Sequence, residues 1–136
     1  MTTFPYRREP SAGFGTILRP VASVLLSTNT ATLEVAMYID SGADMTVIPF
    51  RLGRALGFRQ RPVERIVELS GIGGAGVPYA VRTARMRIGK SSFRIRLAWA
   101  LIEEVPPLLG RVDIFLRFRI LFDERRCRVT FTPVRS

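Results

Sequence analysis

The sequence predicts an all-β fold, a small closed or sandwiched β domain with one or two short helices. Residues 32–40, TLEVAMYID, alternate between apolar and mainly polar side chains, which is the pattern of a half-buried strand. The same alternation recurs in residues 80–88 and 93–102, and the intervening GKSS is a hairpin turn signal. A chain of 136 residues, 47% of them hydrophobic, suits one globular domain.

The first half of the chain begins with a polar, Pro/Gly-containing stretch. We expect residues 1–15 to form a flexible N-terminal arm and residues 16–136 to form a single domain. Residues 19–27, RPVASVLLS, read as a strand that ends in a polar turn. Residues 49–58, PFRLGRALGF, read as a short helix, because apolar residues recur at helical spacing between a proline and a glycine.

The second half adds further strands. Residues 64–71, ERIVELSG, predict a strand before the glycine-rich GIGGAG. Residues 106–118 predict a turn and a second short helix, and residues 119–131 predict a hairpin that turns at 123–126. The sequence therefore predicts six to eight strands and two short helices.

Two residue types narrow the chemistry. The chain has no histidine, which excludes Ser-His-Asp and Cys-His nucleophilic sites and the usual histidine metal sites. Cys127 is its only cysteine, so there is neither an internal disulfide nor a CxxC zinc pair. We expect no metal and no cofactor, and carboxylates are the candidates for catalysis.

The net charge is +10, and Lys90 is the only lysine among 21 basic residues. Such a charge fits a solvated basic face, an acidic partner or nucleic acid. The arginines are spread along the chain rather than concentrated in one basic arm, which makes nucleic acid the less favoured partner. The N-terminus lacks an apolar leader and no stretch reads as a membrane span, so we expect a cytoplasmic protein without membrane contact.

The stretch YIDSGADMTVIP, residues 38–49, places Asp40 at the end of an apolar strand. Asp, Ser and Gly are common turn residues, so DSG alone is explained by a turn. However, a loop between two apolar segments points inward, and a carboxylate there needs hydrogen-bond donors. Small residues at 41–43 let backbone amides approach the carboxylate.

The segment IDSGADMTVIP resembles the active-site loop of retropepsin-like aspartic proteases, in which a hydrophobic strand ends in Asp-Thr/Ser-Gly-Ala. Two more segments match in order: SGIGGAGVPY, where the family has a glycine-rich flap, and LLGRVD, where it has two apolar residues, Gly and Arg before a short helix. The resemblance covers roughly residues 17–131. It implies an acid-protease half-domain with a closed, barrel-like sheet that forms a homodimer.

The resemblance also implies roles for residues. Asp40 is the expected catalytic aspartate, with Ser41, Gly42 and Ala43 supporting its loop; Ser41 replaces the more usual threonine. Asp44 is expected to bind the substrate main chain and to pair with Arg111. The expected flap residues, which would also contact substrate, are Gly71, Ile72, Gly73, Gly74, Ala75 and Gly76. Val112 stands where the family commonly has Asp or Asn, so the resemblance leaves the role of Asp113 open.

The chain contains a single Asp-Ser-Gly, whereas hydrolysis by carboxylates needs two that share a proton. We therefore expect an aspartic endopeptidase that acts as a homodimer on extended peptide or protein substrates, with one Asp40 from each protomer. The apolar tail, residues 127–134, either interleaves with the partner's strands or completes its own sheet.

Two other functions stay open. A protease-fold module with little or no catalytic activity would instead bind an acidic partner through its basic surface. Nucleic acid is a further alternative, in which Arg82, Arg94 and Arg96 line a groove.

Overall fold

The computed structural model describes residues 1–69 and 76–135. The described strands are β1 (Thr2–Pro5), β2 (Arg7–Ser11), β3 (Gly15–Arg19), β4 (Val21–Ser27), β5 (Thr32–Ile39), β6 (Thr46–Ile48), β7 (Val67–Leu69), β8 (Val77–Ile88), β9 (Ser91–Ala100), β10 (Leu108–Leu109), β11 (Phe118–Asp123) and β12 (Arg128–Pro133). One α-helix, α1 (Phe50–Ala55), and one 3-10 helix, η1 (Phe115–Arg117), complete the described elements. The mostly-β class is confirmed, although more strands form than the sequence predicted.

Six strands close into a barrel. Their order is β4-β5-β10-β6-β9-β8, and β8 pairs back onto β4. The longest hairpin, β8–β9, follows the predicted alternation: Ala84, Met86 and Ile88 are buried, as are Phe93 and Ile95. The barrel interior therefore forms one continuous hydrophobic core.

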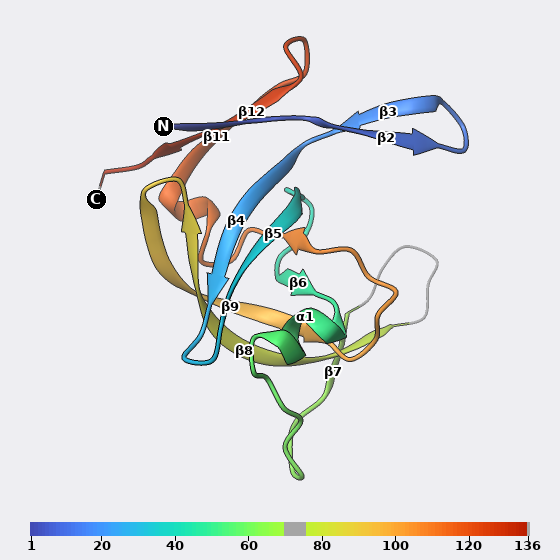
Figure 1. Ribbon diagram of the computed structural model, residues 1–136, viewed down its shortest axis with the longest axis vertical. Helices are drawn as coiled ribbons and strands as arrows, with labels where there is room; N and C mark the ends of the chain where they lie inside the picture. The colour runs from blue at the N-terminus through green and yellow to red at the C-terminus, as the bar shows by residue number, and fades with distance from the viewer. Residues whose placement is uncertain (70–75, 136) are drawn as a thin grey trace.

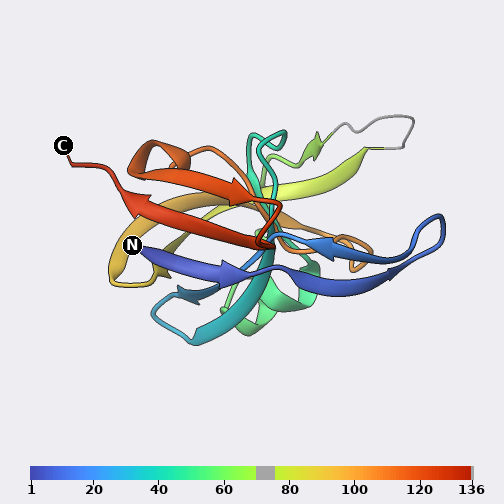
Figure 2. The same cartoon turned by 90° about the horizontal axis from the view of Figure 1, so that it is seen from above.

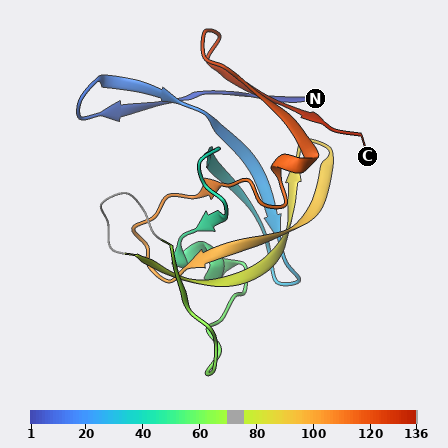
Figure 3. The same ribbon diagram turned by 180° about the vertical axis from the view of Figure 1, so that it is seen from behind.

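A second sheet, with the order β1-β12-β11, lies across one end of the barrel (Figures 1 and 3). Residues 2–5 pair with residues 128–131 in antiparallel register, and Tyr6 is buried in the core. The expected flexible arm over residues 1–15 is therefore corrected. Residues 2–5 form β1 because one edge of β12 is available to pair with them, and residues 7–11 form β2, which pairs with β3. The tail strand β12 completes its own sheet in this protomer.

The β2–β3 hairpin projects beyond the barrel, as the view from above shows (Figure 2). Its two strands are hydrogen-bonded to each other over residues 7–19. Two-stranded hairpins are marginally stable alone. Contacts at its base, described below, hold this hairpin against the barrel.

At the opposite end of the barrel, Trp99 anchors α1. The indole is fully buried, stacks on Phe50 at 5.2 Å between ring centroids, and donates from Nε1 to the Phe50 carbonyl at 2.9 Å. Gly53 lies directly over it, and a Cβ there would come within 2.2 Å of the indole ring. The helix thus begins after Pro49 and ends before Gly57, as predicted, and its glycine permits the close packing.

An ion pair covers the same cluster. Arg82 lies 5.3 Å from the centre of the Trp99 ring and pairs with Glu64, and both side chains are less than 10% exposed. Hydrogen bonds from Arg82 lower the pKa of Glu64 to about 2. The charge of Arg82 is therefore neutralised by Glu64, which removes one of the three arginines from the nucleic-acid interpretation. In the described part of the chain, no helix is long and apolar enough to cross a membrane.

Candidate active site

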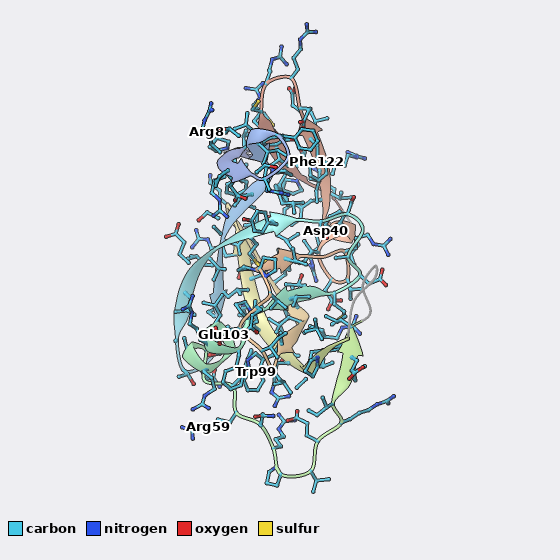
Figure 4. All side chains as sticks on the ribbon, turned by 90° about the vertical axis from the view of Figure 1, so that its right-hand side faces the viewer. Arg8, Asp40, Arg59, Trp99, Glu103 and Phe122 are labelled. Atoms are coloured by element: carbon cyan, nitrogen blue, oxygen red, sulfur yellow. The ribbon has the colours of Figure 1, made fainter. Side chains whose placement is uncertain are left out.

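Asp40 follows directly after β5 and is half-buried (Figure 4). Its backbone N–H donates to the Leu109 carbonyl at 3.0 Å, which fixes the end of the strand. Its Oδ1 accepts the Gly42 N–H at 2.9 Å. A Cβ at position 42 would lie 3.3 Å from that same oxygen, so glycine leaves the amide room to approach. The small turn thus supplies the donor that the carboxylate needs.

The segment after β10 lies against the Asp40 loop along its length. Strand β10 pairs with β5 in parallel and with β6 in antiparallel orientation. Arg111 N–H then donates to the Ala43 carbonyl at 3.0 Å, and Val112 N–H to the Asp44 carbonyl at 2.9 Å. These bonds tie the loop to a chain segment about seventy residues later, so the backbone around Asp40 is fixed from both sides.

Gly110 is required at the centre of this contact. A Cβ there would lie 2.4 Å from the Met45 carbonyl group, so no side chain fits. The Gly110 N–H donates at 3.1 Å to Oγ1 of Thr46, a fully buried polar side chain. The two loops therefore meet backbone to backbone, which explains in physical terms why the motif reads Leu-Leu-Gly.

The remaining predicted loop residues differ in exposure. Ser41 and Gly42 are exposed and Ala43 is half-buried. The Asp44 carboxylate is 74% exposed and forms an ion pair with Arg111 Nη2. The structure thus brings Asp44 and Arg111 together at the edge of the loop, whereas the Ser41 side chain faces solvent in the single protomer.

The predicted flap residues Gly71, Ile72, Gly73, Gly74 and Ala75 lie outside the described residues. Gly76 is described and stands directly before β8. A Cβ on Gly76 would come within 2.6 Å of the Glu68 carboxylate of β7, so the two strands approach closely at this point.

Asp113, whose role the sequence left open, binds Arg96 of β9. Its carboxylate accepts the Arg96 backbone N–H, Nε and Nη2, each at 2.9 Å. These hydrogen bonds lower the pKa of Asp113 to about 2. Arg96 is consequently committed to an internal ion pair, so it does not serve as a free cation of a nucleic-acid groove.

Beside Asp40 the structure contains a pocket of about 520 Å³. The residues around it are Glu9, Arg19, Pro20, Tyr38, Ile39, Asp40, Pro106 and Leu108. Of these residues, the sequence predicts a role at the site for Asp40 alone. Tyr38 had a usable signal, since residues i and i+2 of a strand share a face. The sequence gives no such signal for Glu9 and Arg19, which lie in the expected N-terminal arm and at the start of an expected strand.

Within the described residues, no three His, Cys, Asp or Glu side chains gather closely enough to bind a metal ion. The polar groups of the site are thus one half-buried carboxylate, an exposed hydroxyl, an ion pair and backbone amides. Such a set can hold and polarise a water molecule.

Comparison with known proteins gives two kinds of match. A family model described as aspartyl protease matches residues 26–111. The fold is similar to that of a retropepsin-like aspartic protease from Rickettsia conorii, with a TM-score of 0.62 and 16% identity over 95% of this chain and 98% of that one.

The fold is also similar to that of the EIAV protease in complex with the inhibitor HBY-793. The TM-score is 0.53, with 24% identity over 68% of this chain and 82% of that one. No curated protein sequence matches significantly. The matched segment begins inside β4 and ends at Arg111, so it contains both the Asp40 loop and the Leu-Leu-Gly segment that binds it. The chain is therefore a member of the aspartyl protease family, and its fold is retropepsin-like.

Proposed function

We propose that the protein is an aspartic endopeptidase that cleaves extended peptides as a homodimer. Each protomer would contribute one Asp40, and the two copies would meet at a twofold axis. The half-buried Asp40 carboxylate carries the proposal: it is positioned by Gly42, and no second carboxylate hydrogen-bonds to it within residues 1–69 and 76–135. One protomer therefore provides half of a two-carboxylate site.

The chemistry follows from the pairing. Two carboxylates in contact share one proton, because both cannot stay ionised at short range. The ionised carboxylate takes a proton from water as the water oxygen bonds to the peptide carbonyl carbon, and the protonated carboxylate gives its proton to the carbonyl oxygen. The first carboxylate then passes its proton to the amide nitrogen, which leaves as the C–N bond breaks. The second carboxylate takes a proton from a hydroxyl of the tetrahedral intermediate, so the pair again holds one proton. Activity therefore requires a proton on the pair and declines when both carboxylates lose it.

The dimer needs a contact surface, and the terminal sheet restricts the choice. Because β12 lies between β1 and β11, its two edges are already paired. The free edges of this sheet belong to β1 and β11. Strand β11 exposes Leu121 and Phe122, at 63% and 38%, and exposed apolar residues at a sheet edge are typical of an interface. We therefore expect the partner to contact β11 rather than interleave with β12.

The test combines cleavage with assembly. Wild-type protein should digest a peptide library, a pepstatin-type inhibitor should stop it, and Asp40→Asn should lower kcat/KM by about 10²–10⁴-fold without changing the fold. Sedimentation should detect a dimer under the assay conditions. Retained activity in Asp40→Asn would overturn the assignment of Asp40.

A mixing experiment tests whether each copy gives one aspartate. If subunits exchange freely, an equal mixture of wild type and Asp40→Asn contains about one-quarter wild-type dimers. The mixture should then retain about one-quarter of the activity of the same total amount of wild type. A value of one-half would show that each protomer works alone.

A further inference from the structure

The pocket beside Asp40 draws its walls from two parts of the chain. Tyr38 and Leu108 come from the barrel, whereas Glu9 and Arg19 come from the base of the β2–β3 hairpin. Because the pocket includes Asp40 itself, a peptide bond held at that carboxylate would place a flanking side chain in it. The hairpin is therefore placed to influence which side chain fits.

Glu9 fixes Tyr38 through a compact set of hydrogen bonds. Tyr38 Oη donates to Glu9 Oε2 at 2.6 Å and accepts from Arg7 Nη2 at 2.7 Å. Arg7 Nε also donates to Glu9 Oε2 at 2.8 Å, and the Arg7 guanidinium lies 5.1 Å from the centre of the Tyr38 ring. The Tyr38 hydroxyl is thus satisfied as both donor and acceptor, and the ring is held as a fixed wall.

The placement of the two arginines depends on Glu9. Arg7 and Arg19 are directly opposite each other in the β2–β3 pair, where like charges repel. Glu9 lies two residues from Arg7 on the same strand face and contacts Arg19 Nε through Oε1 at 3.2 Å. The Tyr38 hydrogen bond, with smaller contributions from both arginines, lowers the pKa of Glu9. Glu9 therefore stays ionised under mildly acidic conditions and keeps the arginines together.

Arg19 has unused binding capacity. It contacts Glu9 through Nε, and no acceptor in the described ranges 1–69 and 76–135 binds its two terminal nitrogens. Its side chain is 49% exposed, whereas Glu9 is 18% exposed and has both oxygens engaged. Arg19 is the cationic residue that lines the pocket, where the other charged residues are Glu9 and Asp40, and the free donors belong to Arg19.

We propose that the β2–β3 hairpin is a specificity element of the site. Glu9 positions Tyr38 as a wall of the pocket beside Asp40, and Arg19 at the rim favours a substrate side chain that ends in a carboxylate over one that ends in a cation. The apolar walls formed by Pro20, Pro106 and Leu108 contact the hydrocarbon part of that side chain. This inference rests on the proposed function for the placement of the substrate.

The experiment compares three peptide libraries whose central position is Glu, Gln or Lys between randomised apolar residues. Mass spectrometry counts cuts next to that position, and kcat/KM is measured for each library. Wild type should prefer Glu over Lys by roughly three- to fivefold, the effect of one half-exposed ion pair. Arg19→Gln should reduce the ratio to near one by raising KM for the Glu library.

Arg8→Gln is the matched control. Arg8 lies on the opposite face of β2, is exposed and points away from Asp40 (Figure 4). Arg8→Gln removes the same charge from the same hairpin as Arg19→Gln does. Because Arg8 does not line the pocket, the Glu-to-Lys ratio should stay at the wild-type value. If Arg8→Gln lowers the ratio as much as Arg19→Gln does, the preference reflects overall charge and the proposal is wrong.

A binding measurement separates this proposal from the endopeptidase assignment. Fluorescence titration of Asp40→Asn protein with the Glu and Lys libraries reports pocket preference without turnover. A preference that Arg19→Gln abolishes supports the specificity element even if wild type fails to cleave. Cleavage by wild type with equal use of Glu and Lys, unchanged by Arg19→Gln, overturns the specificity element and leaves the endopeptidase assignment intact.

The role of Tyr38 has its own variant. Tyr38→Phe keeps the ring and removes the hydroxyl that Glu9 and Arg7 bind, so the wall loses its fixed position. We expect a broader preference among apolar side chains next to the cut, with the Glu-to-Lys ratio at Arg19 largely kept. An unchanged apolar preference would show that Glu9 does not position Tyr38 for selectivity.

Discussion

Asp40 and Trp99 lie at different heights of the same barrel, and their surroundings differ in kind (Figure 4). Around Trp99 the indole N–H is paired with a carbonyl and Arg82 is paired with Glu64, and all three side chains are buried. Around Asp40 the backbone is held by hydrogen bonds, but the side chains of Ser41, Asp44 and Arg111 remain largely exposed. The polar groups beside Trp99 are thus paired within the chain, whereas several polar side chains beside Asp40 are exposed.

The difference separates two uses of glycine. Gly53 lets a helix pack on the Trp99 ring, so it serves the core. Gly42 and Gly110 let backbone groups reach a carboxylate and a neighbouring loop, so they serve the geometry of the site. Changes near Trp99 should therefore act on folding, and changes near Asp40 mainly on activity.

Trp99→Ala should have the largest effect on stability. It removes a fully buried aromatic side chain, its stacking on Phe50 and its hydrogen bond, and should lower the free energy of unfolding by about 3–5 kcal/mol. Urea denaturation measures this, with Asp40→Asn as the comparison variant expected to stay within about 0.5 kcal/mol of wild type. If the two variants were equally unstable, the two ends of the barrel would not differ as described.

Gly110→Ala should lower both stability and catalytic activity. Its Cβ would overlap the Met45 carbonyl, so the two loops must move apart, at a cost of about 1–3 kcal/mol in stability. Because the same contact fixes the Asp40 loop, kcat should fall as well. Gly13→Ala is the matched control, since no atom lies within 4 Å of the added carbon. Wild-type activity in Gly110→Ala would show that the loop contact is unnecessary for function.

Substitution of Asp113 tests whether its ion pair with Arg96, which lies near the site, contributes to stability. Its pKa is lowered to about 2 by Arg96, so its stabilisation is complete above pH 4–5 and is lost as pH falls towards 2. Asp113→Asn should remove about 0.5–1 kcal/mol at pH 6 and much less at pH 2. Urea midpoints at several pH values measure this loss. Asparagine tolerates the positive φ of 68° at this position, so backbone strain should not obscure the result.

Asp44→Asn should have the smallest effect on folding. The Asp44–Arg111 pair is more than half exposed on both sides, so its loss should change stability by less than about 0.5 kcal/mol. If Asp44 binds the substrate main chain, KM should rise by roughly tenfold, the effect of one charge-assisted hydrogen bond. An unchanged KM together with a large loss of stability would assign the pair to folding instead.

The strand alternation and the three motifs were sufficient to predict the fold class and the family. Both signals are local: alternation reports one buried face, and Asp-Ser-Gly reports one tight loop. They also identified the segments that meet, since Leu-Leu-Gly contacts the Asp40 loop directly.

Long-range pairing of polar segments could not be predicted. Residues 2–5 have no strong strand signal, and they form β1 because β12, more than 120 residues later, provides a partner edge. Glu9 likewise contacts Tyr38, 29 residues later, only because the β2–β3 hairpin folds back on itself and places β2 beside the barrel. Arg82 differs from its prediction for another reason: its charge predicts a surface position, but Glu64, 18 residues earlier in the chain, pairs with it and both side chains are buried.

The pairing of β1 with β12 has a consequence for any maturation by cleavage near the N-terminus. Residues 2–5 are hydrogen-bonded along β12, and Tyr6 N–H donates to the Cys127 carbonyl at 2.8 Å. A protease binds its target as a free extended segment, so the hydrogen bonds between residues 2–5 and β12 must first break. Trimming there would leave β12 with an open edge that another chain can occupy, so processing would alter assembly and not merely shorten the polypeptide.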